Sequence, residues 1–281
     1  MTMIIVKLSG GMGNQMFQYA LGRSLALKYN TKLKIDLSFL NRKDMGPGFI
    51  YREYDLDLFN VKSDFTINPF RRVIKVNEPH FHYSQELIND LDVKLKDGKN
   101  IQLNGYWQTP QYFTDVENVL RLDFQFKDKV EYAQDNLISE MYTLIKNTNA
   151  VMINVRRADY LNTNFHGVMG NDFIMNGVEY LKSRVENPHF FIFSDDIEWC
   201  KENIKLDNMT IVDHNYKGHK FGYYLQLMSI CKHFIIPNST FAWWAAWLNN
   251  SPEKIVIAPK HWFTDSNINT NDIMPSDWIR L

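Results

Sequence analysis

The stretch Met3–Leu37, MIIVKLSGGMGNQMFQYALGRSLALKYNTKLKIDL, carries the pattern that decides the fold. Its first six residues are mostly apolar, which predicts a buried strand, and glycines follow at once. From about Gln15 to Tyr29 apolar residues recur at helical spacing. Leu33–Leu37 then predicts a second strand. Strand, glycine turn, helix and strand in this order make a βαβ unit, whose two strands run parallel.

The second half of the chain continues this alternation of short apolar strands and helices. The strands are predicted at Ala150–Val155, Phe190–Phe193, Thr210–Val212, Phe234–Pro237 and Lys254–Ala258, and the helices at Glu179–Val185, Glu198–Asn203, Tyr223–Cys231 and Thr240–Leu248. Such alternation is typical of a parallel sheet with helices on both faces. The pattern is indistinct between Asn41 and Leu103, and Lys129–Asn147 predicts a long amphipathic helix. We therefore expect an α/β protein of two domains, residues 1–148 and 149–281.

Composition excludes several classes of function. The 281 residues hold 31 Lys and Arg against 32 Asp and Glu, so a general nucleic-acid binder is not expected. The two cysteines, Cys200 and Cys231, lack metal-ligand spacing and suit a reducing compartment. No run of 18 apolar residues predicts a membrane span, and the first residues lack the pattern of a signal peptide. We expect a cytoplasmic protein, with peripheral membrane association left open.

Polar clusters follow three of the predicted strands in the second half. They are Arg156–Arg157, Ser194–Asp196 and Asn238–Thr240. Ligands of open parallel sheets bind beyond the carboxyl ends of the strands. Three clusters at the same edge of one sheet therefore favour a binding site there.

The two adjacent arginines are candidates for a phosphate clamp. Side chains of neighbouring strand residues point to opposite faces, so one arginine can face a ligand while the other braces the fold. A guanidinium group binds phosphate oxygens in bidentate geometry and keeps its charge when buried. The alternative is a structural ion pair with Asp159 or another carboxylate.

The other two clusters also allow two interpretations. Ser239 and Thr240 stand where a helix begins, and free backbone N–H groups at a helix N-terminus suit a phosphate. Asp195 has a carboxylate that suits a ribose or a base. For both clusters the alternative is ordinary capping of the helix that follows, and the aromatic run after Thr240 favours core packing.

The glycine turn near the N-terminus is a weak match to a dinucleotide-binding fingerprint. Gly11 and Gly13 fit, but Met16 stands at the third glycine position, and Asp36 ends the next strand. This match is the basis of an alternative function, a nucleotide-dependent oxidoreductase. Two Asp-x-Asp triplets, at 55–57 and 90–92, could hold a metal but favour solvated surface, so no metal site is predicted.

Five segments occur in an order that is specific as a set. They are LSGGMGNQMFQYALG (8–22), NGYWQTPQYF (104–113), NVRRADY (154–160), FSDD (193–196) and NSTFAWWAAWL (238–248). From Met3 to Trp262 the chain resembles the α-1,2-fucosyltransferases of glycosyltransferase family 11. The resemblance implies a GT-B fold, in which two Rossmann-like domains face a central cleft. It also implies a GDP-fucose donor, a galactose 2-hydroxyl in a glycan acceptor, inversion at the anomeric carbon, and no cofactor or metal.

The resemblance further implies roles for individual residues. Arg156 would contact the diphosphate. Asp159 and His166 are candidate bases by their position on the loop after the clamp strand and not by the resemblance, with an ion pair to an arginine and packing within the loop as their respective alternatives. The substrate-binding residues would be Gly11, Gly13, Asn14 and Gln15 near the sugar, Asn154 and Arg157 beside the clamp, Ser194 and Asp195 near the nucleoside, and Asn238, Ser239, Thr240 and Phe241 around the phosphates and base.

Three departures from the family pattern bear on the mechanism. Asn154 stands where relatives carry histidine, and Ala158 where they carry glycine. Asparagine forms hydrogen bonds but carries no proton near neutral pH. Relatives also often have an acidic residue in the helix that here includes Tyr223 and Tyr224, which puts guanine recognition by that carboxylate in doubt. A non-catalytic protein that binds a GDP-sugar is therefore a further alternative.

Overall fold

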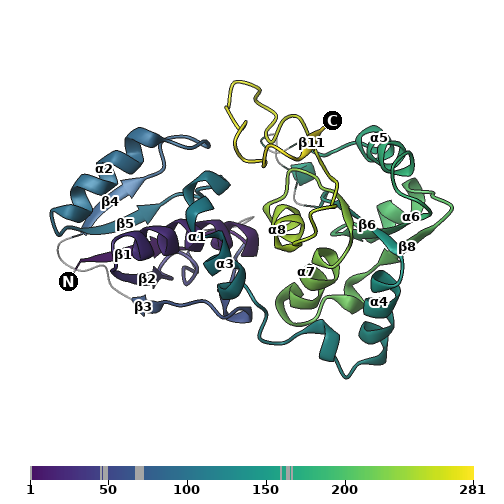
Figure 1. Cartoon of the computed structure of the whole chain (residues 1–281), viewed down its shortest axis with the longest axis horizontal. Helices are drawn as coiled ribbons and strands as arrows, with labels where there is room; N and C mark the ends of the chain where they lie inside the picture. Colours follow the sequence, from purple (N-terminus) through teal and green to yellow (C-terminus); the bar gives the residue numbers. More distant parts are fainter. Residues whose placement is uncertain are drawn as a thin grey trace. The chain divides into compact units, whose positions relative to one another are not determined.

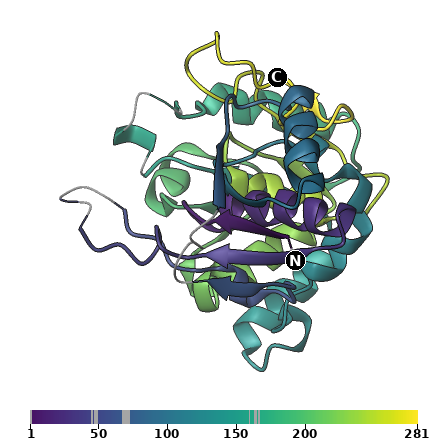
Figure 2. The ribbon, with the colours of Figure 1, turned by 90° about the vertical axis from the view of Figure 1, so that its left-hand side faces the viewer.

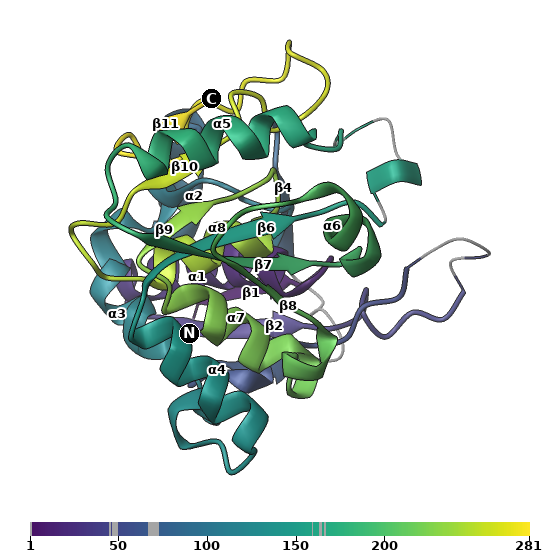
Figure 3. The same cartoon turned by 90° about the vertical axis from the view of Figure 1, so that its right-hand side faces the viewer.

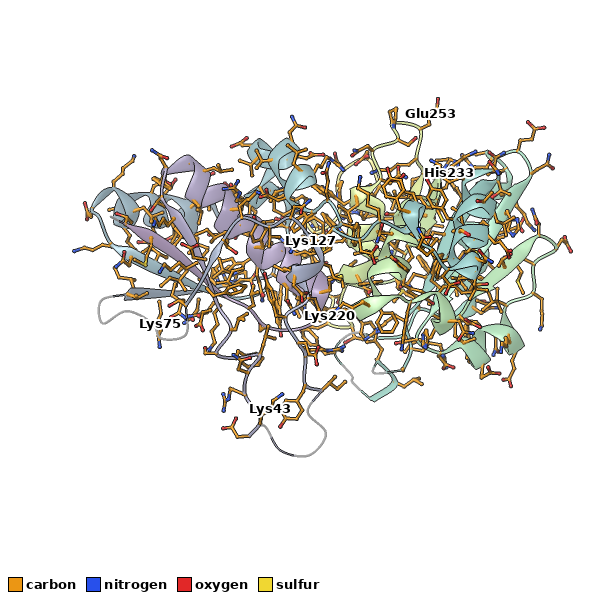
Figure 4. All side chains as sticks on the ribbon, turned by 90° about the horizontal axis from the view of Figure 1, so that it is seen from below. Lys43, Lys75, Lys127, Lys220, His233 and Glu253 are labelled. Carbon is orange, nitrogen blue, oxygen red and sulfur yellow. The ribbon has the colours of Figure 1, made fainter. Side chains whose placement is uncertain are left out.

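The computed structural model describes residues 2–44, 46, 50–66, 73–158, 160–162, 165 and 167–281. The chain divides into two compact units, each built around one parallel sheet (Figure 1). Unit 1 is Met1–Lys127 with Asn269–Met274, and unit 2 is Asp128–Ile268 with Pro275–Leu281. Figure 4 labels Lys127, the residue at which the first long segment of unit 1 ends. The functional division at residues 148 and 149 stays a prediction.

The sheet of unit 1 has five parallel strands in the order β3-β2-β1-β5-β4 (Figure 2). Its elements are β1 (Met3–Lys7), α1 (Met12–Lys28), β2 (Lys32–Asp36), η1 (Leu56–Leu58), β3 (Asp64–Thr66), β4 (Val73–Asn77), α2 (Gln85–Lys96), β5 (Asn100–Asn104), η2 (Pro110–Tyr112), η3 (Thr114–Val116) and α3 (Glu117–Asp123). The predicted βαβ unit is confirmed, because β1 and β2 pair in parallel on either side of α1 in the chain.

Helix α1 begins at Met12, three residues earlier than its periodicity predicts, since Gly11 takes the N-cap position in extended conformation. The helix packs closely on the sheet. A Cβ at Gly22 would lie 2.3 Å from Val6 Cγ2 of β1 and 2.8 Å from Leu33 Cδ1 of β2. Only glycine therefore lets the helix approach both strands at this point.

Unit 2 has a six-stranded parallel sheet in the order β11-β10-β9-β6-β7-β8. Its elements are η4 (Val130–Tyr132), α4 (Asn136–Lys146), β6 (Asn149–Val155), η5 (Tyr160–Asn162), α5 (Asn171–Lys182), β7 (Pro188–Ser194), α6 (Ile197–Asn203), β8 (Met209–Val212), η6 (His214–Tyr216), η7 (His219–Phe221), α7 (Gly222–Ser229), β9 (His233–Ile235), α8 (Thr240–Leu248), β10 (Val256–Ala258) and β11 (Ile279–Arg280). Figure 3 shows β9, β6, β7 and β8 side by side.

Helices cover both faces of this sheet, as predicted. On one face the side chains of α5 and α6 pack with alternate residues of the central strands, such as Val151, Ile153 and Ile192. On the other face, the ring of Phe193 lies 5.0 Å from that of Tyr224 in α7. The strands are buried from both sides, which explains why they read as continuous apolar runs.

Two helix predictions for the second half need correction. The helix expected over Lys129–Asn147 is divided: η4 is a short 3₁₀ turn, and α4 begins after Asp135, whose carboxylate accepts the N–H of Leu137 at 2.8 Å. Helix α5 begins at Asn171, well before the predicted Glu179. Gly177 interrupts the apolar pattern of the helix, so the turns before it were not predicted. The glycine lets α5 lie against Ile235, because a Cβ at this position would be 3.0 Å from Ile235 Cδ1. Within the described ranges no helix is long and apolar enough to cross a membrane.

Candidate active site

The site predicted in unit 2 lies where the strand order of the sheet changes direction. From β6 the chain adds β7 and β8 on one side, and then returns to place β9 on the other side. The carboxyl ends of β6 and β9 are thus neighbours at a topological switch point, where open α/β sheets bind ligands. Arg156 follows β6, and Ser239 and Thr240 follow β9. The fold brings these two predicted clusters to this point, and the third follows β7, the strand that pairs with β6.

Asp195 organises the loop that carries the arginines. Its Oδ1 accepts the backbone N–H of Arg157 at 2.8 Å, and its Oδ2 accepts that of Ala158 at 3.2 Å. The same Oδ2 lies 3.0 Å from Nη1 of Arg156. The described contacts of this carboxylate therefore hold the loop after β6, and contact with a nucleoside stays a prediction.

The two arginine side chains have different environments, as their adjacent positions predict. Arg157 lies over the ring of Trp199, with its Cζ 4.2 Å from the ring centroid, and its Nε is 3.5 Å from Oδ2 of Asp196. Arg156 lies 5.5 Å from the ring centroid of Tyr160 and keeps 29% of its side-chain surface exposed. The Arg157 side chain keeps 18% of its surface exposed, so both arginines are partly exposed, and Arg156, the more exposed of the two, is the better placed for a ligand.

The alternative interpretation of the two arginines, that they form structural ion pairs, also agrees with the structure. Both form ion pairs, although with Asp195 and Asp196; Asp159, the partner named from the sequence, lies outside the described residues. Ion pairs that are partly exposed contribute little stability, about 0–1 kcal/mol. A diphosphate offers more charge and more acceptor oxygens than one carboxylate, so the pair with Asp195 is compatible with Arg156 binding such a ligand.

The segment after β9 brings a helix N-terminus to the same edge. Ser239 is the N-cap residue of the nine-residue α8, and its side chain makes no capping hydrogen bond. Asn238 is buried and its Nδ2 donates to the carbonyl oxygen of Trp262 at 3.0 Å, which fixes the turn before the helix. The hydroxyl of Tyr160 donates to the carbonyl oxygen of Asn238 at 2.9 Å. This bond ties the arginine loop to the start of α8, where the partial positive charge of a helix N-terminus favours an anion.

Tyr224 links the ends of β7 and β8, a contact that the sequence did not reveal. Its buried hydroxyl accepts the N–H of Ser194 at 2.9 Å and donates to the carbonyl oxygen of Val212 at 2.8 Å. Burial of the hydroxyl raises the pKa of Tyr224 well above its ordinary value, so the group stays neutral. Tyr224 lies in α7, and its hydrogen bonds to two strand ends give it a structural role.

The remaining predicted residues of unit 2 have mainly structural contacts. Asn154 is half-buried, and its Nδ2 donates to the carbonyl oxygen of Phe193 on β7 at 3.1 Å. Ser194 Oγ accepts the N–H of Asp196 at 2.8 Å, and Asp196 in turn caps α6. The Ser194–Asp196 cluster therefore caps helix α6, as the alternative interpretation predicted. Phe241 is half-buried in the first turn of α8, while Asp159 and His166 lie outside the described residues.

In unit 1 the glycine turn is held by amide side chains. Gln15 is fully buried, and its Nε2 donates to the carbonyl oxygens of Gly10 at 3.0 Å and Glu53 at 2.7 Å. Asn14 Oδ1 accepts from Nε2 of Gln108 at 2.9 Å. Gly11 and Gly13 form the start of α1. These contacts define the turn, and its approach to a sugar stays a prediction.

Three other carboxylates, Asp36, Asp90 and Asp92, have partners within unit 1, the first buried and the other two at the surface. Asp36 is buried and accepts from Gln102 Nε2 at 2.8 Å and from the N–H of Ser38 at 2.8 Å. In the second triplet, Asp90 pairs with Lys94, and Asp92 with Lys28. The described part of the chain contains no group of three or more His, Cys, Asp or Glu that could hold a metal ion.

Two α/β units, one of them with arginines and a helix N-terminus at the switch point of its sheet, agree with the predicted class of glycosyltransferase, and comparison with known proteins gives the family. The chain belongs to glycosyl transferase family 11, whose model matches residues 1–281. An α-1,2-colitosyltransferase of Escherichia coli is 30% identical, over 100% of this chain and 99% of that protein. Human galactoside α-(1,2)-fucosyltransferase 1 is 26% identical over 85% of this chain and 64% of its own length.

The fold also has solved counterparts. The fucosyltransferase NodZ from Bradyrhizobium superposes with a TM-score of 0.52 over 88% of this chain and 92% of that structure, at 12% identity. The likeness shows the fold, which is the two-unit α/β architecture of the GT-B type. The predicted fold class is confirmed, and the predicted central cleft stays a prediction.

Proposed function

We propose that this glycosyltransferase moves L-fucose from GDP-fucose to the 2-hydroxyl of a galactose in a glycan acceptor, forming an α-1,2 link with inversion. The observation that carries the proposal is the match over the whole chain to a family whose similar members are named for α-1,2 transfer. The partly exposed guanidinium of Arg156, which Tyr160 connects to the turn before α8, supports a diphosphate donor. Colitose is a second candidate for the transferred sugar, since the 30% identical relative is named for it.

The reaction we infer is a single displacement. The acceptor oxygen forms a bond to the anomeric carbon while the bond from that carbon to the diphosphate oxygen breaks. Negative charge grows on the departing GDP, and Arg156 with the N–H groups of α8 stabilises it there. The hydroxyl proton passes to a base, for which Asp159 and His166 are the proposed groups. Asn154 takes no part in that transfer, because an amide does not accept a proton near neutral pH.

The deciding experiment is an activity assay with two donors and a panel of galactosides. The protein is incubated with GDP-fucose or GDP-colitose in the presence of EDTA, and the linkage of any product is read by NMR. We expect an α-1,2-linked product with EDTA present, since we propose that no metal takes part. GDP binding without transfer or hydrolysis would support the non-catalytic alternative. Binding of NADH in place of GDP would support the oxidoreductase, which family membership does not favour.

The cellular location we propose is the cytoplasm. Cys200 and Cys231 are both buried and unpaired, and burial raises the pKa of the Cys200 thiol to about 11, so it remains a thiol. Free, inert thiols fit a reducing compartment.

A further inference from the structure

An exposed phenylalanine and histidine stand together where β7 and β8 end, and the site described above does not use them. His214 is the second residue after β8, and Phe221 is the residue before α7. Their ring centroids are 5.6 Å apart, with the ring planes 83° apart. Tyr224, whose hydroxyl joins β7 and β8, lies 5.7 Å from Phe221 and 6.0 Å from His214. We call the first two residues the His214–Phe221 pair.

The backbone that presents Phe221 is strained. Lys220 (φ 49°, ψ 32°) and Phe221 (φ 62°, ψ 21°) are successive residues in left-handed conformation, and neither is glycine. Such conformations cost about 1–2 kcal/mol per residue for L-amino acids. Figure 4 labels Lys220 in this turn. Strain of this kind is usually offset by burial, yet Phe221 remains 39% exposed. The structure therefore holds an aromatic ring at the surface at a cost in stability, which is a common feature of binding sites.

His214 connects this surface to the arginine clamp. Its Nε2 lies 2.9 Å from the carbonyl oxygen of Ser194. A carbonyl oxygen only accepts, so Nε2 carries the proton and the ring is fixed in orientation. The residue after Ser194 is Asp195, which pairs with Arg156. Because successive Cα atoms are about 3.8 Å apart, His214 and Arg156 contact neighbouring residues: Ser194, the last residue of β7, and Asp195, the residue after it.

The chemistry around the pair suits one part of a nucleotide. The Nζ of Lys217 lies 5.8 Å from the ring centroid of Phe221, so positive charge accompanies the ring. The first turn of α7 contains no acidic residue. Recognition of a base by a carboxylate is therefore not available from this helix, whereas stacking on an aromatic ring needs no such group. Stacking of a base on an aromatic side chain is tolerant of base identity and strong enough to matter for affinity.

We propose that the His214–Phe221 pair binds the nucleobase of the donor by stacking on Phe221, while Arg156 binds the diphosphate. The proposal rests on the proposed function, in which the donor is a nucleoside-diphosphate sugar. It adds the residues that hold the base. Both residues follow β8 in the chain, and His214 contacts the end of β7. In the sheet, β7 is next to β6 and β8 is next to β7.

The test compares two ligands that differ only by the nucleoside. GDP and inorganic pyrophosphate are titrated by calorimetry into the wild type, Phe221→Ala and Phe221→Gly. We expect GDP affinity to fall about tenfold to a hundredfold in both variants, the range that loss of one base stack gives, with pyrophosphate affinity unchanged. Tyr132→Ala is the matched control, because Tyr132 is an aromatic residue of the same unit with 69% exposure. It should leave both affinities unchanged.

Phe221→Gly separates a binding role from a structural one. Glycine adopts left-handed conformation without strain, so this variant should unfold at nearly the wild-type denaturant concentration while binding GDP weakly. GDP affinity within twofold of wild type in both variants would overturn the proposal, and so would a parallel loss of pyrophosphate affinity. ADP and UDP are titrated as well. If the wild type binds one of these and not GDP, the proposed donor fails while the variants still test stacking; if it binds no nucleoside diphosphate, both proposals fail.

Discussion

At the scale of single residues, Arg156 is the side chain on which the proposed chemistry depends most. Replacing Arg156 with alanine removes the guanidinium that would stabilise the leaving diphosphate, and we expect kcat/KM for transfer to fall at least about 100-fold, the usual effect of losing one such donor. Folding should change little, because the ion pair with Asp195 is partly exposed. Arg184→Ala is the control, because Arg184 is an exposed arginine two residues past the end of α5. Turnover near the wild-type rate in Arg156→Ala would refute the clamp.

A second residue-scale prediction concerns the hydroxyl of Tyr224. The change Tyr224→Phe leaves the ring in place but removes the partner of the Ser194 N–H and of the Val212 carbonyl. Buried groups left without a hydrogen bond cost about 1–3 kcal/mol, so the free energy of unfolding should fall by that amount in urea titrations. Tyr223→Phe is the matched control, since the Tyr223 hydroxyl bonds the exposed Asp128. Equal stability of the two variants would mean that the buried bridge contributes no more than the exposed hydrogen bond of Tyr223.

At the scale of elements, Gly22 shows how closely α1 packs on its sheet. Alanine favours helices over glycine by about 1 kcal/mol, which alone would stabilise the chain. The added Cβ, however, would lie 2.3 Å from Val6 Cγ2 and 2.8 Å from Leu33 Cδ1. We expect the clash to prevail, so that Gly22→Ala lowers the unfolding free energy by about 1–3 kcal/mol. Ser24→Ala on the same helix gains propensity without such a clash and serves as the control. A gain in stability for Gly22→Ala would show that helix and sheet separate easily.

The elements also show what the sequence could and could not predict. Strands such as β6 and β7 are buried on both faces, so their apolar runs predicted them well. By contrast, β4 has the burial pattern of a half-exposed edge strand, and β3 has only three residues. Neither produces a clear period, which is why the region from Asn41 to Leu103 was indistinct.

In the candidate site, too, some residues could be predicted from the sequence and others could not. Arg156 and Ser239 were predictable, because they follow strands whose ends the pattern located. The contacts of Tyr224 and Phe221 depend on how distant segments meet and on left-handed backbone at residues that are not glycine, and no local pattern encodes either feature.

At the scale of the whole molecule, we expect the carboxyl group of Glu78 in unit 1 to change how the free energy of unfolding depends on pH. Glu78 accepts the backbone N–H groups of Tyr106 at 2.7 Å and Trp107 at 2.9 Å. Burial nevertheless raises its pKa from 4.5 to about 7. The folded chain thus binds this proton more tightly than the unfolded chain does. The stabilisation is complete below about pH 4.5 and is lost as pH rises through 7, with an upper limit of about 3 kcal/mol.

Other groups oppose this trend, so the prediction is tested as a difference between two proteins. Burial lowers the pKa values of His189 and His233, which makes stability rise with pH near 6. In Glu78→Gln those histidines remain and the carboxyl is gone. We expect the unfolding free energy of the wild type, minus that of Glu78→Gln, to be larger at pH 5 than at pH 8 by about 2–3 kcal/mol in urea titrations. If the two proteins show parallel pH profiles, Glu78 titrates alike in the folded and unfolded chain, and the two backbone N–H groups offset the effect of its burial.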